Sequence, residues 1–157
     1  MNETPTPSYD LTILLALAFR SLIDELHAHL ASLGYDDVRP SHGFAFQRIS
    51  HGDATGNDIA AFLGITKQAA SELIDYLEAH NYITRQPNPT DKRGKIITLT
   101  PRGWNCIRET EAFLTRFEQQ FAATIGKDRM SALRSDLHTL VLSANKGHMP
   151  TKLRPVW

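Results

Sequence analysis

Residues 55–82, "TGNDIAAFLGITKQAASELIDYLEAHNY", decide the fold, because they have the features of two helices joined by a tight turn. Thr55 and Asp58 have the spacing of a capping box at the start of the first helix. Gly64 can adopt the left-handed conformation that ends this helix, and Thr66 is a good N-cap for the second. Together these signals predict a helix-turn-helix.

The second helix has one apolar face. The spacing of its residues predicts that Ala69, Leu73, Ile74 and Leu77 are buried. The helix should end at Asn81, because asparagine tolerates the left-handed backbone that closes a helix. The polar first turn is then left on the surface.

Two short β-rich runs follow, "YITRQP" at 82–87 and "KIITLT" at 95–100, and they are connected by "NPTDKRG" at 88–94. Ile97 and Leu99 alternate with their neighbours, as expected for a half-buried strand. The connection is longer than a two-residue turn, so the sequence predicts a protruding hairpin. Four cations fall within eleven residues of this hairpin: Arg85, Lys92, Arg93 and Lys95.

Amphipathic helices are expected on both sides of this unit. Apolar residues recur at steps of three and four from Leu11 to Leu33, and a shorter helix is expected after Pro40. Pro101 starts a long helix, and a last helix is expected over about residues 128–145. Three apolar residues of the long helix repeat every seven positions: Ile107, Leu114 and Phe121. A small winged domain cannot cover this much apolar surface, so we expect a two-fold dimer.

The composition bounds the class of protein. With 157 residues, 41% of them hydrophobic, the chain suits one globular domain. It has no apolar run near the roughly 20 residues of a membrane span and no basic, apolar leader at its start, so we expect a soluble, cytoplasmic protein.

The net charge is zero, yet residues 1–80 hold four cations and eleven anions, and residues 81–157 hold thirteen cations and six anions. A local basic feature is therefore compatible with the neutral total.

The run from Ala54 to Ile107 resembles the core of the MarR (multiple antibiotic resistance regulator) family in the order of its elements. Asp91 and Arg93 carry the family's wing signature of Asp, any residue, Arg, and "LTPRG" at 99–103 matches the junction after the wing. Two departures are Asn81, where the family commonly has glycine, and "YDDVRPSHGF" before the second helix.

The resemblance covers nearly the whole chain, and it implies an α+β, mostly α fold. The expected architecture is a winged helix-turn-helix with a two-stranded wing hairpin, flanked by N- and C-terminal dimerisation helices. In a single domain over 1–157, the dimerisation helices would span about 9–34 and 101–145. The DNA-binding lobe would span about 40–100, and 146–157 would form a tail.

The first turn of the second helix holds candidate DNA-binding residues. Such a helix fits the major groove, where its exposed N-terminal residues reach base edges. Lys67 can donate to guanine, Gln68 can pair with adenine, and Ser71 and Thr66 can contact phosphate or base. The alternative is an ordinary solvated first turn.

The hairpin tip supplies the other candidates. Arg93 can enter a narrow minor groove while Asp91 stabilises the wing tip, and Lys92 and Lys95 can lie near phosphates. The alternative is a charged tip that only keeps the hairpin soluble.

These residues favour a sequence-specific transcriptional regulator, a repressor, that binds double-stranded DNA at a pseudo-palindromic operator as a homodimer. The resemblance implies release by a small aromatic or phenolic effector. Phe19, His42, Phe46 and Trp104 are candidates for lining its pocket, although aromatic residues at such spacing also form plain core.

Other classes of function are less consistent with the sequence. It has no phosphate-binding loop, nucleophile elbow or His-Glu-x-x-His pattern, so we expect no enzyme and no cofactor. The seven histidines are scattered, so we expect no metal site. Cys106 is a candidate redox thiol or a buried structural residue. A winged-helix protein-interaction module without DNA binding remains the alternative function.

Overall fold

The computed structural model describes residues 9–92 and 94–152, and the fold is mostly helical with one antiparallel pair of strands. The elements, in chain order, are α1 (Leu11–Ser32), α2 (Pro40–Ser50), α3 (Gly56–Leu63), α4 (Lys67–Ala79), β1 (Ile83–Pro87), β2 (Lys95–Leu99), α5 (Pro101–Ile125) and α6 (Lys127–Ala144). This order confirms the predicted winged helix-turn-helix with helices on both sides.

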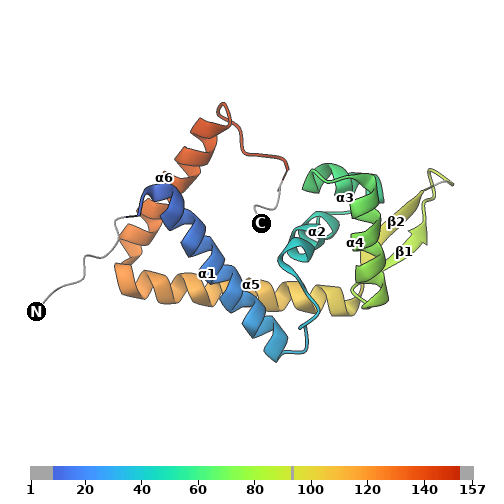
Figure 1. Cartoon of the computed structure of the whole chain (residues 1–157), viewed down its shortest axis with the longest axis horizontal. Helices are drawn as coiled ribbons and strands as arrows, with labels where there is room; N and C mark the ends of the chain where they lie inside the picture. Colours follow the sequence, from blue (N-terminus) through green and yellow to red (C-terminus); the bar gives the residue numbers. More distant parts are fainter. Residues whose placement is uncertain (1–8, 93, 153–157) are drawn as a thin grey trace, which may run out of the picture.

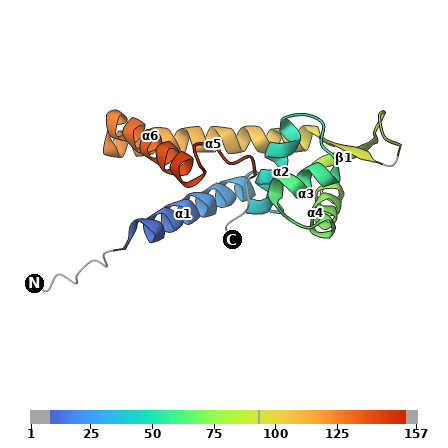
Figure 2. The same ribbon diagram turned by 90° about the horizontal axis from the view of Figure 1, so that it is seen from above.

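Figure 1 and Figure 2 show that the elements form two connected parts. One part, which we call the lobe, holds α2, α3, α4 and the hairpin of β1 and β2; the other, the arm, holds α1, α6 and most of α5. α5 begins beside the hairpin and runs out along the arm, where α1 and α6 contact it. In the described part of the chain, no helix has both the length and the apolar character that a membrane span requires.

The predicted start and stop signals of the helix-turn-helix are confirmed. Thr55 Oγ1 accepts a hydrogen bond from the Asp58 amide at 3.3 Å, and the Thr55 amide donates to the Asp58 carboxylate at 2.8 Å. Thr66 caps α4. Gly64 and Asn81 have φ values of 63° and 61° at the ends of α3 and α4. Local sequence therefore sets both helices and the turn between them.

The prediction that Ala69 is buried is wrong, because Ala69 is exposed and its neighbour Ala70 is buried. α4 buries Ala70, Ile74 and Leu77, which follow one another at steps of four and three. Ala69 lies roughly 100° around the helix from Ala70, which turns it towards solvent. Leu73 is partly buried and packs against the core.

The base of the hairpin belongs to the core of the lobe. β1 and β2 pair Ile83 with Leu99 and Arg85 with Ile97. The Ile97 amide also donates to the carbonyl of Ala54 at 2.8 Å, which joins β2 to the segment before α3. Ile83 and Ile97 are buried. The tip of the hairpin, in contrast, extends away from the helices (Figure 2).

Cys106 lies in the same core, and its side chain is 1% exposed. Burial raises the pKa of its thiol to about 11, because the thiolate would lose its solvation. A thiol that stays protonated at neutral pH is a poor nucleophile. These properties favour the structural role of Cys106 over the redox role.

The start of α5 lies against the start of β1 at Gly103, which is buried. A Cβ atom on Gly103 would lie 2.3 Å from the carbonyl oxygen of Tyr82 and 2.9 Å from the Leu99 side chain. The nearest atom belongs to the backbone, which cannot rotate away as a flexible side chain can. The close packing of α5 on the hairpin therefore depends on glycine at this position.

We expect Gly103→Ala to destabilise the protein by about 1–3 kcal/mol or more, as overpacking of a core does. Gly43 in α2 is the matched control, because it is exposed and a Cβ there would meet nothing within 4 Å. Gly43→Ala should be neutral or should stabilise the helix by up to about 1 kcal/mol. Urea unfolding of both variants measures the difference. Equal effects of the two alanines would contradict the close-packing argument.

Candidate nucleic-acid interface

The first turn of α4 lies on the surface of the lobe. Lys67, Gln68 and Ser71 are exposed, as is Thr66 before them. The side chain of Thr66 is used locally, because its Oγ1 accepts a hydrogen bond from the amide of Ala69 at 3.1 Å. The predicted contact residues of α4 whose side chains are exposed are thus Lys67, Gln68 and Ser71.

A groove brings part of this turn together with the hairpin. It has a volume of about 260 Å³, and Lys67 and Ser71 of α4 line it together with Lys95 of β2. Residues from the start of α3, including Asn57, also line it. The structure therefore places three of the predicted contact residues, from two separate elements, around one concave surface. Asn57 was not predicted, and its position two residues after the Thr55 cap was the available signal.

The tip of the hairpin is built by backbone hydrogen bonds. The Gly94 amide donates to the carbonyl of Asp91 at 3.1 Å, and the Asn88 amide donates to the carbonyl of Gly94 at 3.3 Å. Asn88 Oδ1 accepts a hydrogen bond from the Thr90 amide at 3.0 Å. Lys92 and Asp91 are exposed at this tip. Arg93, the predicted minor-groove residue, lies outside the described residues.

Arg85 has a different role from the other hairpin cations. Its guanidinium forms ion pairs with Asp75 and Glu78, both on α4. The positive charge of Arg85 is therefore compensated, and the pairs link β1 to the helix that carries Lys67 and Ser71. Sequence reasoning counted Arg85 only as part of a basic cluster. The available signal was the spacing of Asp75 and Glu78, which lie three positions apart and therefore on one face of α4.

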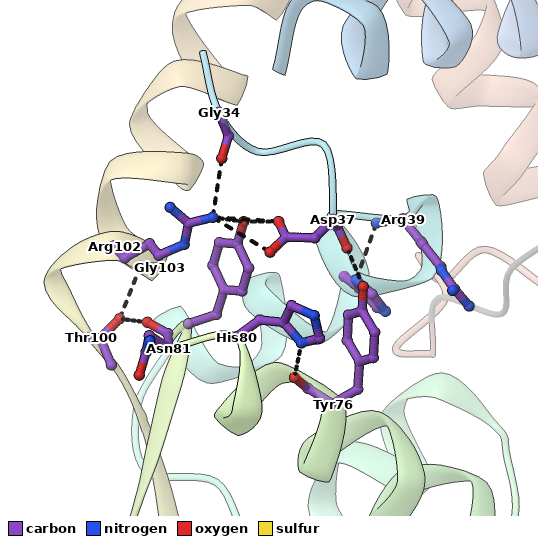
Figure 3. Close-up of polar contacts among 11 residues, drawn as sticks. Gly34, Asp37, Arg39, Tyr76, His80, Asn81, Thr100, Arg102 and Gly103 are labelled. Atoms are coloured by element: carbon purple, nitrogen blue, oxygen red, sulfur yellow. Dashed lines mark hydrogen bonds and ion pairs between the residues drawn. The ribbon is translucent and has the colours of Figure 1, made fainter. Parts of the chain in front are cut away.

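A second polar cluster, which we call the joint, connects the lobe to the arm (Figure 3). Arg102 on the first turn of α5 donates to the hydroxyl of Tyr82 at 2.9 Å and to the carbonyl of Gly34 at 3.1 Å. Its Nη2 lies 3.5 Å from the carboxylate of Asp37, to which the Tyr82 hydroxyl also donates. The guanidinium stacks over the rings of Tyr35 and Tyr82, with centroid distances of 5.1 and 4.7 Å.

The surroundings of Tyr82 stabilise its neutral form. Burial, and then the hydrogen bond to Asp37, raise the pKa of the Tyr82 hydroxyl well above its usual value. The phenol therefore remains a hydrogen-bond donor at any physiological pH. The joint was missed in the sequence, although Arg102 belongs to the "LTPRG" junction and Asp37 to the departing segment "YDDVRPSHGF".

His42 extends the joint towards α4. The Arg39 amide donates to His42 Nδ1 at 3.1 Å, and the His42 ring lies 5.0 Å from the ring of Tyr76. The Tyr76 hydroxyl donates to the carbonyl of Asp37 at 2.9 Å. Burial, and then the charge of Arg39, lower the pKa of His42 to about 4. A neutral imidazole thus packs between α2 and α4.

The four residues predicted to line an effector pocket lie in different places. Phe46 lines a cavity of about 310 Å³ between α2 and α5. Trp104 borders another depression, beside Ile49 and β2, and is 41% exposed. His42 is buried, and Phe19 is exposed on α1. Within 9–92 and 94–152, no three His, Cys, Asp or Glu side chains gather as a metal site requires.

Comparison with protein families gives one match, of residues 39–94 to the MarR family. This segment spans α2 to the tip of the hairpin. A stretch of 62 residues is 39% identical to a riboflavin kinase from Thermoplasma acidophilum. It covers 40% of this chain and 27% of the kinase, so the chain spans about a quarter of that enzyme's length.

Solved structures share the fold over most of the chain. The reduced form of MarR from E. coli is 20% identical, with a TM-score of 0.72 over 87% of this chain and 99% of that one. A transcriptional regulator from Thermotoga maritima is 25% identical, with a TM-score of 0.63 over 88% and 96% of the two chains. A mutant of MepR from S. aureus, bound to an oligodeoxyribonucleotide, is 21% identical, with a TM-score of 0.62 over 87% and 99%.

The family match covers the helix-turn-helix and the first strand of the hairpin, and the structural similarity extends to the helices of the arm. Residues 39–94 are therefore similar to the MarR family, and the described chain has the winged-helix fold of the solved MarR structures.

Proposed function

We propose that the protein is a sequence-specific DNA-binding regulator that binds a pseudo-palindromic operator as a homodimer. The first turn of α4 would enter the major groove, and the hairpin would lie along the flank of the site. The observation that carries this proposal is the groove shared by Lys67 and Ser71 of α4 and Lys95 of β2. The oligodeoxyribonucleotide bound to the MepR relative supports the same use of this fold.

The arm supports the homodimer. α6 buries no residue in the described chain, and α1 buries only Leu26 and Leu30. Large apolar side chains are exposed on both helices: Leu11, Ile13, Leu14, Leu15, Leu17, Phe19, Leu133 and Leu140. A second copy of the chain would remove this surface from water. A two-fold axis through the arms would then present two α4 helices to two half-sites.

We further propose a repressor that a small aromatic or phenolic ligand releases from DNA. The cavity between α2 and α5 suits such a ligand, with Phe46 and Leu114 as apolar walls and Gln47 and His51 as polar groups. α2 belongs to the lobe and α5 extends into the arm. A ligand between them can therefore change how the two lobes are spaced on DNA.

The alternative is a winged-helix module that binds another protein. Such a module would be expected to present an apolar or acidic surface on α4 and the hairpin. The groove instead contains Lys67, Lys95 and Ser71, and the compensated Arg85 lies beside them. Cationic and hydroxyl groups around a concave surface suit phosphates and base edges.

Replacing Lys67 or Gln68 by alanine should weaken binding to a duplex that the wild-type protein selects from a randomised pool. The expected loss of binding free energy is about 1–3 kcal/mol per base contact on that duplex and much less on random DNA. Lys152→Ala, at an exposed position in the tail, is the control for loss of one positive charge. Fluorescence anisotropy with both duplexes gives the comparison.

Equal losses on both duplexes would make Lys67 and Gln68 phosphate contacts. Unchanged binding by every α4 variant would reject DNA reading by this helix and would favour the protein-interaction module.

Arg93→Ala should abolish tight binding to the selected duplex, whereas Arg93→Lys should recover only the salt-dependent part. Arginine presents a planar fork to base acceptors in a narrow minor groove, and lysine retains only the charge. Asp91→Ala should give a milder defect, because it loosens the tip without removing the contact. Affinity at two salt concentrations, with circular dichroism as the folding control, tests this order. An Arg93→Ala protein that binds like wild type would make the tip a solubility device.

A further inference from the structure

The exposed face of α4 carries a side-chain pair next to the proposed base contacts. Gln68 Nε2 donates to Glu72 Oε1 at 3.2 Å, one helical turn away, and both residues are exposed. The other acidic residues of α4, Asp75 and Glu78, are both bound by Arg85. Among the described residues, Glu72 forms no ion pair with a cation. Its carboxylate instead accepts the hydrogen bond from Gln68.

This contact selects one orientation of the Gln68 amide. A side-chain amide has a donor end and an acceptor end, and a rotation of 180° exchanges them. The carboxylate of Glu72 only accepts hydrogen bonds, so it attracts the NH₂ group and repels the carbonyl oxygen. The Gln68 oxygen and the second N–H are then left to face outward in a fixed order.

That order matters for base recognition in the major groove. Adenine presents N6–H as a donor and N7 as an acceptor, and a glutamine amide pairs with both when its oxygen and N–H lie in the matching order. The reversed amide would place its oxygen opposite N7, where two acceptors repel each other. We infer that Glu72 is a positioning residue that holds the Gln68 amide in the orientation that recognises adenine. This inference rests on the proposed DNA-binding function.

The same arrangement has an electrostatic consequence. A carboxylate on the face of α4 that approaches DNA is repelled by every phosphate, whatever the sequence. Glu72 therefore lowers the affinity for all duplexes while it raises the preference for one base. The protein then binds duplexes without the preferred base more weakly, and this increases its specificity.

The experiment compares Gln68→Ala, Glu72→Ala and the double variant on the duplex that wild type selects. The adenine to change is the one that Gln68→Ala no longer prefers over other bases. Three derivatives of the duplex carry each of the other three bases at that position. We expect either single variant to reduce the preference for adenine about ten-fold. The double variant should lose no more of the preference for adenine than Gln68→Ala alone loses, because Glu72 acts through Gln68. Glu72→Ala should also bind a random duplex more tightly than wild type does.

Asp36→Ala is the matched charge control, because Asp36 is exposed outside α4. It should leave the base preference unchanged, and circular dichroism should show equal helix content for all variants. A Glu72→Ala protein that keeps the full adenine preference would overturn the inference. Additive losses in the double variant would also overturn it, because they would make Glu72 an independent base contact. A wild-type protein that prefers no sequence would overturn both this inference and the proposed function, and that result appears before any variant is measured.

Discussion

The rest of the structure depends on the ion pair and hydrogen bonds that Arg102 makes at the joint. α5 runs from the lobe into the arm as one helix, so the position of its first turn sets how the lobe is oriented on the arm (Figure 1). Arg102 fixes that turn to Asp37 in the α1–α2 connection and to Tyr82 at the start of the hairpin. Loss of the guanidinium would leave a partly buried carboxylate without its counter-charge, which is costly. In the proposed dimer, the orientation of the two lobes would change with it.

Two residues, Thr100 and Arg85, link the hairpin to α4 and its C-terminal end. Thr100 Oγ1 donates to the carbonyl of Asn81 at 2.6 Å, and its amide donates to the carbonyl of Tyr82 at 3.0 Å. On the other side, Arg85 binds the two acidic residues near the end of α4. These contacts hold the helix that would enter the major groove and the hairpin that would reach the minor groove in one relative position. Such preorganisation lowers the entropic cost of binding.

The sequence predicted the features that depend on neighbouring residues. The capping box of α3, the left-handed Gly64 and Asn81, and the pairing of the two strands are local signals, and all appear in the structure. The alternation expected in β2 appears only in part, because Ile97 is buried while Leu99 is intermediate like Thr98. The joint was missed because its members are separated by 45 and 20 residues and form no periodic pattern. Aromatic character gave no information about which cavity a side chain borders, so the four effector-pocket residues were grouped without a geometric reason. The exposure of Lys67, Gln68 and Ser71 was predictable because the N-terminal turn of such a helix points away from the core.

The central claim is that two copies of the chain place two α4 helices in successive major grooves, with the hairpins on the flanks. Hydroxyl-radical footprinting on the selected duplex tests this most directly, because it reports the position of every contact along both strands. The account predicts a two-fold symmetric footprint, with two protected segments whose centres are about 10 base pairs apart and with weaker minor-groove protection outside them. A single asymmetric segment, or weak protection spread evenly along the duplex, would contradict it.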